Sequence, residues 1–277
     1  MRAEGVALVT GASRGIGRAV ATELARRGFD VVATMRDPSA GAGLDGMRVE
    51  RLDVDDPASI NLPASLRVLV NNAATESDYL PVEHIPMTMW RQMFETNVFG
   101  LIEVTRRAIP IMREAGGGVV CNITSSSLFA PMPFYAAYRA GKAAVGAIGE
   151  SLRAELAPFG IRVREVMPGP IATDMLAASN RLPEAAAHEP YRAMAERVLE
   201  LRQGVESAST SPADAAAAIV DAICDDDAPL RVGCDPMSVA MLDHWRAVDD
   251  ETNMAGLLAA FGPARGGGPE TGPARGG

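Results

Sequence analysis

Tyr138 and Lys142 are the residues whose types and spacing could carry out proton transfer. They stand four apart in a predicted helix, so both side chains project from one face. A free tyrosine has a pKa near 10, and bringing it to about 7 requires roughly 4 kcal/mol of differential stabilisation of the phenolate. A neighbouring ammonium has the sign needed. The pair could act as an acid and base, although such a pair on a helix is more often a lysine packed beside an aromatic ring.

Ser125 adds a third polar group thirteen residues before Tyr138. It follows the predicted strand Val119 to Ile123, and the strand ends of open α/β sheets are where these folds meet their ligands. A hydroxyl at that edge can hold the oxygen atom of a substrate. Three groups suited to proton transfer and substrate positioning are therefore expected at one sheet edge.

A glycine cluster, Thr10 to Gly17, lies where the first predicted strand passes into an amphipathic helix. Gly11 permits a tight turn, Gly15 allows close approach of a pyrophosphate, and Gly17 lets the helix pack against the sheet. The backbone N–H groups and the positive helix end favour an anion. A purely structural glycine-rich turn is the alternative, and the position between strand and helix favours dinucleotide binding.

The end of the second predicted strand bears on the choice of dinucleotide. An NAD enzyme places an acidic residue there, on the ribose 2′-hydroxyl, whereas this chain has Met35 followed by Arg36. The Arg36 guanidinium is available to a 2′-phosphate, and Arg14 could add a second positive charge. Solvated surface arginines are the alternative for each. The sequence predicts NADP(H) as the preferred cofactor, with NAD(H) also possible.

Short apolar runs alternate with helical patterns through most of the chain, which predicts an α/β fold with a single Rossmann-type doubly wound parallel sheet and helices on both faces. The predicted strands are Val6 to Thr10, Val31 to Thr34, Met47 to Leu52, Val68 to Val70, Val119 to Ile123 and Val163 to Val166. Long helices are expected from Met87 to Arg113, with room for an interruption, and from Tyr138 to Leu156, ending at Pro158 and Gly160.

One domain is expected over residues 1–261. The crossover after Asp53 is short and contains Pro57 and Pro63, which predicts a trimmed helix or a loop. Periodicity weakens at about 174–212, apart from a possible helix from Tyr191 to Leu201, and we interpret this segment as a substrate-covering insertion. Residues 262–277 are rich in glycine and proline and are predicted to be disordered.

Composition excludes several classes of protein. The net charge of -9 disfavours nucleic-acid binding, because no basic patch offsets it. Cys121, Cys224 and Cys234 lack the spacing of metal sites, and no metal is expected. Without a secretory signal or a membrane-spanning apolar run, a cytoplasmic protein that acts on a small molecule is expected.

In order and spacing, these motifs resemble the classical short-chain dehydrogenases/reductases over roughly residues 5 to 250. Within that family, residues 33–37, 138–174 and 230–233 look most like the 17β-hydroxysteroid and retinol dehydrogenase-like branch. The resemblance rests on the glycine turn, Asn71-Asn72-Ala73-Ala74, Asn97, Ser125, Tyr138 with Lys142, and Pro168-Gly169 with Thr173. It implies an oxidoreductase in which the cofactor contacts include Gly11, Ser13, Arg14, Gly15, Ile16, Gly17, Arg36, Asp53, Val54, Asn72, Ala73, Tyr138, Lys142, Pro168, Gly169, Ile171 and Thr173.

The same resemblance assigns roles to the reacting groups. Tyr138 exchanges a proton with the substrate oxygen, Ser125 positions that oxygen, Lys142 binds the nicotinamide ribose and lowers the tyrosine pKa, and Asn97 holds a water in a proton relay. Hydride transfer belongs to the cofactor. Two positions depart from the family pattern: Ala74 replaces a usual glycine, and Gly141 a common serine.

The branch suggests a bulky apolar alcohol or ketone, with a pocket lined by Phe129, Met132, Phe134, Met175 and Leu176, although core packing is an equal alternative for each. A non-catalytic dinucleotide-binding regulator or scaffold is the alternative function, and an epimerase or dehydratase of the extended branch is a third. The resemblance also favours a homodimer or homotetramer built on the two long helices.

Overall fold

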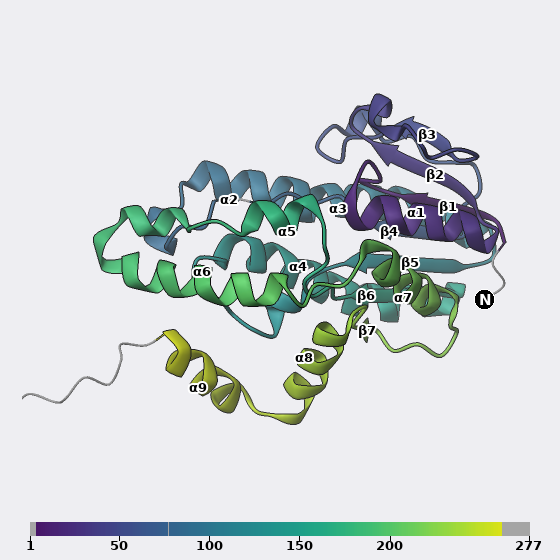
Figure 1. Cartoon of the computed structure of the whole chain (residues 1–277). Coiled ribbons are helices and arrows are strands. Elements are labelled where there is room, and N and C mark those ends of the chain that lie inside the picture. The colour runs from purple at the N-terminus through teal and green to yellow at the C-terminus, as the bar shows by residue number, and fades with distance from the viewer. Residues whose placement is uncertain (1–3, 77, 262–277) are drawn as a thin grey trace, which may run out of the picture.

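The computed structural model describes residues 4–76 and 78–261 of the 277-residue chain. A parallel sheet forms its centre, in the strand order β3-β2-β1-β4-β5-β6-β7 (Figure 1). The strands are β1 (Val6–Val9), β2 (Asp30–Met35), β3 (Arg48–Arg51), β4 (Val68–Asn71), β5 (Gly118–Ile123), β6 (Ile161–Val166) and β7 (Arg231–Val232). The predicted doubly wound sheet is confirmed, and the strand order reverses between β1 and β4, where such folds bind ligands.

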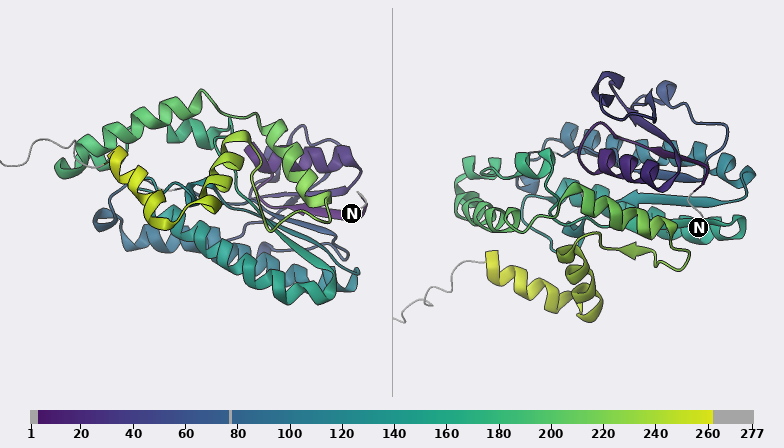
Figure 2. Two further views of the ribbon diagram at one scale, coloured as in Figure 1. Left: turned by 90° about the horizontal axis from the view of Figure 1, so that it is seen from below. Right: turned by 45° about the vertical axis from the view of Figure 1, so that its right-hand side comes forward.

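Helices cover both faces of this sheet. On one face α1 (Gly15–Arg27) and α7 (Pro212–Cys224) pack through Val20, Leu24, Ile219 and Ile223. On the other, α3 (Leu101–Glu114) and α4 (Ala136–Leu156) contribute apolar side chains to a second core cluster. The two layers lie on opposite sides of the strands (Figure 2, left). Because both faces are covered, β4 and β5 are buried along their whole lengths.

The predicted helix from Met87 to Arg113 is interrupted, as the sequence allowed. It consists of α2 (Met87–Phe94), the π-helix η4 (Glu95–Gly100) and α3. Gly100 lets η4 approach the loop after β3, since a Cβ atom at that position would lie 2.7 Å from Val54 Cβ. Single π-helical turns often mark functional sites, and Asn97 lies in this one.

Two further predictions, about the end of a helix and about the short crossover, are confirmed. The helix predicted from Tyr138 begins two residues earlier as α4, ends at Leu156 and passes through the 3-10 turn η6 (Ala157–Phe159) into Gly160, which has φ +67°. The crossover between β3 and β4 contains only the short turn η2 (Pro57–Ser59). Other short turns are η1 (Pro38–Gly41), η3 (Val82–His84) and η5 (Ser126–Leu128).

Segment 174–212 is mostly helical despite its weak periodicity. It contains α5 (Asp174–Ser179), η7 (Glu184–Ala187), η8 (Glu189–Tyr191) and α6 (Arg192–Glu206), which extends the predicted helix by five residues. Small residues, among them Ala185, Ala195 and Val198, form the buried side of η7 and α6. Alanines give a weak apolar pattern, so the sequence periodicity underestimated the helical content of this region.

The C-terminal part holds elements that the sequence analysis did not anticipate. The edge strand β7 has two residues, too few for a strand pattern, and α8 (Pro236–Ala247) and α9 (Asp250–Phe261) follow it. The tail predicted to be disordered, 262–277, lies outside the described residues. None of the helices in the described part of the chain combines the length and hydropathy that a bilayer-spanning segment needs.

Candidate active site

The glycine turn between β1 and α1 leaves the start of the helix open. Gly11 and Gly15 have φ +66° and φ +56°, and Ala12 N–H donates to Thr34 O at 2.9 Å, which fastens the turn to β2. Exposed Arg14 is the N-cap residue of α1, but its side chain makes no capping hydrogen bond, and the first turn holds no acidic residue. The leading N–H groups of α1 thus lack a side-chain acceptor, and Ser13 and Ile16 flank them. This arrangement fits the pyrophosphate of a dinucleotide.

Asn72 and Thr10 join this turn to the end of β4. Asn72 Nδ2 donates to the carbonyl oxygens of Thr10 (3.0 Å) and Gly11 (3.1 Å), and the Thr10 hydroxyl accepts from the N–H groups of Asn72 (3.0 Å) and Ala73 (3.1 Å). A Cβ atom at Gly17 would collide with the Asn72 amide and with Gly11 O. Gly17 therefore makes room for the Asn72 side chain as well as for helix packing.

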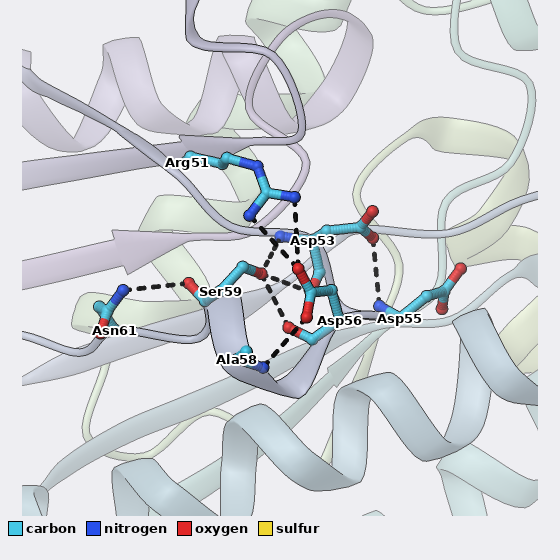
Figure 3. Close-up of polar contacts among 7 residues, drawn as sticks. All are labelled: Arg51, Asp53, Asp55, Asp56, Ala58, Ser59 and Asn61. Carbon is cyan, nitrogen blue, oxygen red and sulfur yellow. Dashed lines mark hydrogen bonds and ion pairs between the residues drawn. The ribbon is translucent and has the colours of Figure 1, made fainter.

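The adenine end of the expected cofactor site lies at the short crossover (Figure 3). Asp53 Oδ1 accepts from Asp55 N–H at 3.1 Å, and Asp53 N–H donates to Ser59 Oγ at 2.8 Å. Ser59 Oγ also donates to Asp56 O at 2.8 Å. Thr96, in η4, donates from its hydroxyl to Asp55 Oδ2 at 2.8 Å. Local hydrogen bonds thus replace a crossover helix and fix the Asp53 carboxylate beside the sheet.

Arg36 lies exposed directly after β2. The side chain before it, Met35, is buried at 2% exposure. The carboxylate of Asp37 accepts from Ser39 N–H at 3.0 Å. Hydrogen bonds with the side chain and the backbone of Ser39 lower the pKa of Asp37. Arg36 is therefore the basic side chain that this strand end offers to a ligand.

Ser125 and Tyr138 lie at the carboxyl edge of the sheet. Ser125 follows β5, and its hydroxyl accepts from Ser127 N–H at 3.2 Å. Burial raises the pKa of Tyr138 above its ordinary value, with a smaller rise from the charge of Glu76, and a hydrogen bond with Ser125 opposes both. In the protein alone, desolvation of the phenolate thus outweighs the neighbouring groups, and the expected lowering of this pKa stays a prediction.

Lys142 is the only lysine in the sequence. It is 5% exposed, its Nζ donates to Ile123 O at 2.8 Å, and Nζ lies 5.7 Å from the centre of the Tyr138 ring. Burial lowers its pKa to about 8, against the opposing charge of Glu76. All other basic side chains, apart from three histidines, are arginines, which keep their charge. The chain thus places its one side-chain ammonium beside Tyr138.

Asn97 is buried in η4 and holds the loop that follows β4. Its Oδ1 accepts from Thr75 N–H at 2.7 Å, and its Nδ2 donates to Thr75 O at 2.9 Å. A Cβ atom at Gly141 would lie 3.7 Å from Asn97 Cβ, an ordinary contact, so space alone does not explain the glycine. The role of Asn97 in holding a water stays a prediction.

The loop after β6 runs beside the glycine turn. Pro168 O accepts from Ser126 N–H at 2.9 Å, and Ile171 forms a parallel bridge with Thr210. Thr173 is the N-cap residue of α5, and its methyl group would lie 3.3 Å from a Cβ atom added at Gly15. The glycine turn expected to bind the pyrophosphate and the loop expected to face the nicotinamide are therefore adjacent in space.

Asp235 supports this loop and was missed in the sequence analysis. Its Oδ2 accepts from Gly169 N–H at 2.7 Å, and its Oδ1 accepts from Ser238 N–H at 2.9 Å in a capping box at the start of α8. Asp followed by Pro236 and then Ser238 is a helix-start pattern that could have revealed the cap. The contact with Gly169 could not have been found in this way, because it joins residues 66 positions apart.

Arg139 is a second residue that the motifs did not reveal. From α4, its Nε donates to Ser127 O at 2.7 Å and its Nη2 donates to Leu128 O at 3.2 Å. It thus ties the helix of Tyr138 and Lys142 to the turn that starts at Ser125. No local pattern marks it, since its position in the sequence is that of an ordinary helical arginine.

The five apolar candidates for the substrate pocket divide between two regions. Phe129 packs with Met167 and Leu242, near α8, whereas Met132 and Phe134 pack beneath α6, and Met175 and Leu176 lie on α5. Phe134 is the only non-glycine residue with positive φ (+72°) among the described residues. Its strained backbone precedes α4, and such strain is concentrated at functional sites.

Comparisons with known proteins agree with this geometry. The family model described as short chain dehydrogenase matches residues 5–47 and 58–183. The unmatched stretch between them includes β3 and the start of the short crossover. An uncharacterized oxidoreductase of Bacillus subtilis is 38% identical over 191 residues, which are 63% of this chain and 68% of that protein.

Two further relatives are informative. Estradiol 17-beta-dehydrogenase 2 of Rattus norvegicus is 33% identical over 62% of this chain and 50% of its own length. The crystal structure of a short chain dehydrogenase from Burkholderia cenocepacia in complex with NADP superimposes with a TM-score of 0.75, at 26% identity over 93% of this chain and 99% of that one.

Proposed function

Because the chain belongs to the short-chain dehydrogenase/reductase family of oxidoreductases, we propose that it transfers a hydride between NADP(H) and a carbonyl or secondary alcohol. The observation that carries this proposal is the meeting of Ser125, Tyr138 and the buried Lys142 at one sheet edge. That edge adjoins a helix start whose N–H groups no side chain caps. Proton transfer and dinucleotide binding are thus available side by side.

The reacting side chains have complementary tasks. Ser125 donates a hydrogen bond to the substrate oxygen and holds it near Tyr138. In carbonyl reduction Tyr138 gives its proton to that oxygen, and in alcohol oxidation it takes the proton back. The nicotinamide, when bound, supplies or accepts the hydride.

Lys142 and the neighbouring loops prepare the site for this exchange. The Lys142 ammonium has the sign that stabilises a tyrosinate, and it would also hold the nicotinamide ribose. Asn97 would hold a water that connects Lys142 to solvent. Gly169, kept in place by Asp235, would face the nicotinamide.

The preference for NADP(H) rests on charge at the adenosine end. Arg36 is exposed beyond β2, and Arg14 is exposed in the glycine turn, so two guanidinium groups are free to bind a 2′-phosphate. Solved structures similar to this chain include complexes with NADP and with NAD, so the proposed preference depends on these arginines. NAD(H) lacks the phosphate and would gain little from these arginines.

The substrate is proposed to have a bulky apolar body. Met132 and Phe134, beneath α6, and the partly exposed Met175 on α5 offer apolar contacts, and a relative named for estradiol acts on such a molecule. Segment 174–212 would cover the substrate as an insertion in a single domain over residues 1–261. A homodimer or homotetramer in the cytoplasm stays a prediction.

A substrate screen with NADPH and NADH side by side tests the proposal. Ketones and secondary alcohols of increasing apolar size are offered, and the absorbance of the reduced cofactor is followed. We expect turnover with NADPH at lower cofactor concentrations than with NADH, and better turnover of the larger apolar compounds. Tight NADPH binding without oxidation of the cofactor by any carbonyl would favour a dinucleotide-binding regulator instead.

A further inference from the structure

Arg202 is a buried guanidinium whose hydrogen bonding is incomplete. It projects from α6 and is 7% exposed. Its Nη1 donates to Ser179 O, but Nε and Nη2 have no hydrogen-bond partner among the residues that the structure describes. A buried donor left without an acceptor destabilises the folded protein, and more strongly when it is charged. The chain tolerates this cost on one edge of the guanidinium.

Two tyrosine rings connect the guanidinium to the reacting groups. The guanidinium carbon lies 3.9 Å from the centre of the Tyr79 ring and 4.6 Å from that of Tyr135. Tyr135 directly precedes α4, and its ring centre is 6.4 Å from that of Tyr138. Arg202 therefore lies on an aromatic platform that continues to the proton-carrying residue.

The charges buried around this platform do not balance. Glu76 interacts electrostatically with Arg202, Arg181 and Lys142. Arg181 is exposed and is paired with Asp78 and Glu184, whereas Arg202 and Lys142 are both more than nine-tenths buried.

One carboxylate thus faces two buried cations. Burial also raises the pKa of Glu76, which weakens its hold on a negative charge. The region carries an excess of positive charge, and an anion would offset it.

We infer that Arg202 binds a carboxylate group of the substrate, so that the enzyme acts on oxo acids or hydroxy acids with an apolar chain. This inference rests on the proposed function and assigns the polar end of the same substrate. Nε and Nη2 form one edge of the guanidinium, and two parallel N–H groups match the two oxygens of a carboxylate. The aliphatic part of the substrate would lie along Tyr135 and Phe134, toward Tyr138.

A purely structural role for Arg202, as a tie between α6 and the tyrosines, makes a different prediction. Loss of such a tie would disturb the covering segment and affect charged and neutral substrates alike. The carboxylate site affects them unequally. Matched pairs of substrates therefore separate the two roles.

The first test compares oxo acids with their methyl esters, using 4-oxopentanoate, 5-oxohexanoate and 7-oxooctanoate as NADPH-dependent substrates. The wild type should prefer at least one acid over its ester in kcat/KM. Arg202→Met should lower kcat/KM for that acid by about 10- to 100-fold, through KM, and leave the ester within a few-fold. Arg202→Lys should recover part of the loss, because it keeps the charge but not the paired donors.

The matched control is Arg192→Met on the same helix. Arg192 is half exposed and pairs with Glu189, so this variant should leave the acid and the ester unchanged. A wild type that prefers every ester, or an Arg202→Met variant that loses both substrates equally, would overturn the carboxylate site. Turnover of neutral ketones would still uphold the proposed function in that case.

A binding measurement decides the inference even if no oxo acid is turned over. Calorimetry on the NADP⁺-saturated protein compares hexanoate with hexanamide. We expect the wild type to bind hexanoate the more tightly and Arg202→Met to lose that preference. Equal binding of both ligands by the wild type, or an unchanged preference in the variant, would contradict a carboxylate site.

Discussion

The edge of the sheet and the covering segment 174–212 are built on different principles. At the edge, Ser125, Tyr138 and Lys142 are held by the helix and turn that bear them and by backbone contacts such as that from Lys142 to Ile123 O. In the covering segment, Arg202 owes its surroundings to residues far away in sequence, among them Tyr79 and Tyr135. The first region is defined locally, and the second only by the tertiary fold.

The family match follows the same division. It includes all of the reacting side chains but ends at residue 183, before α6 begins. The family model thus includes the residues proposed for the chemistry but not the covering helix. This difference suggests that variants at the sheet edge should impair every substrate, whereas variants in α6 should discriminate among substrates.

Lys142→Met is expected to have a large effect on every class of substrate. It removes a buried charge beside Tyr138 and leaves Ile123 O without its donor, so kcat/KM should fall by about 10³-fold for acids, esters and ketones alike. Steady-state assays on these substrates and a melting curve for the variant check this. A loss confined to one substrate class would mean that Lys142 recognises substrate. Lys142 and Arg202 would then not differ in the way proposed here.

The titration of Lys142 sharpens the same point. Because burial lowers its pKa to about 8, the ammonium should lose its proton as the pH rises through about 8, and carbonyl reduction should weaken over that range. Protein labelled with ¹⁵N-lysine contains one side-chain Nζ, so its chemical shift can be followed by NMR without ambiguity. A midpoint near the ordinary lysine value would show that Lys142 is not desolvated.

Much of the sheet edge could be read from the sequence, because its information is local. Each of its signals lies within one element or directly after it: the spacing of Tyr138 and Lys142 on a helix, the glycines after β1, and Ser125 after β5. Asp235 and Arg202 depend on packing between elements that are distant in sequence. The raised pKa of Tyr138 also escaped prediction, since desolvation requires knowledge of what covers the ring.

Asp235→Asn should have an intermediate effect, on the cofactor. The amide keeps an oxygen for Gly169 N–H but loses the charge, and hydrogen bonds to charged groups are worth about 1.5–3 kcal/mol, so the Kd for NADPH should rise by about 10-fold while kcat changes little. Asp243→Asn on the same helix, where Asp243 is exposed, serves as the control. An unchanged Kd would show that the loop does not need this carboxylate.

Arg36→Asp should have the smallest effect on turnover and a selective effect on cofactor choice. Exposed charge pairs contribute about 1 kcal/mol or less, so the ratio of NADH to NADPH in kcat/KM should shift toward NADH by about 5- to 10-fold, with repulsion of the 2′-phosphate adding to the loss of attraction. Both cofactors are titrated at a fixed substrate concentration. Equal losses of kcat/KM for the two cofactors would show that Arg36 does not bind the 2′-phosphate.

Tyr138→Phe tests the central claim most directly, because it removes one hydroxyl and keeps the ring that packs beside Tyr135. NADPH binding, followed by fluorescence, should stay within a few-fold of the wild type. Oxidation of NADPH by the best carbonyl substrate should fall by about 10²- to 10⁴-fold. A variant that binds NADPH and reduces the carbonyl as fast as the wild type would contradict the assignment of Tyr138 as the proton carrier.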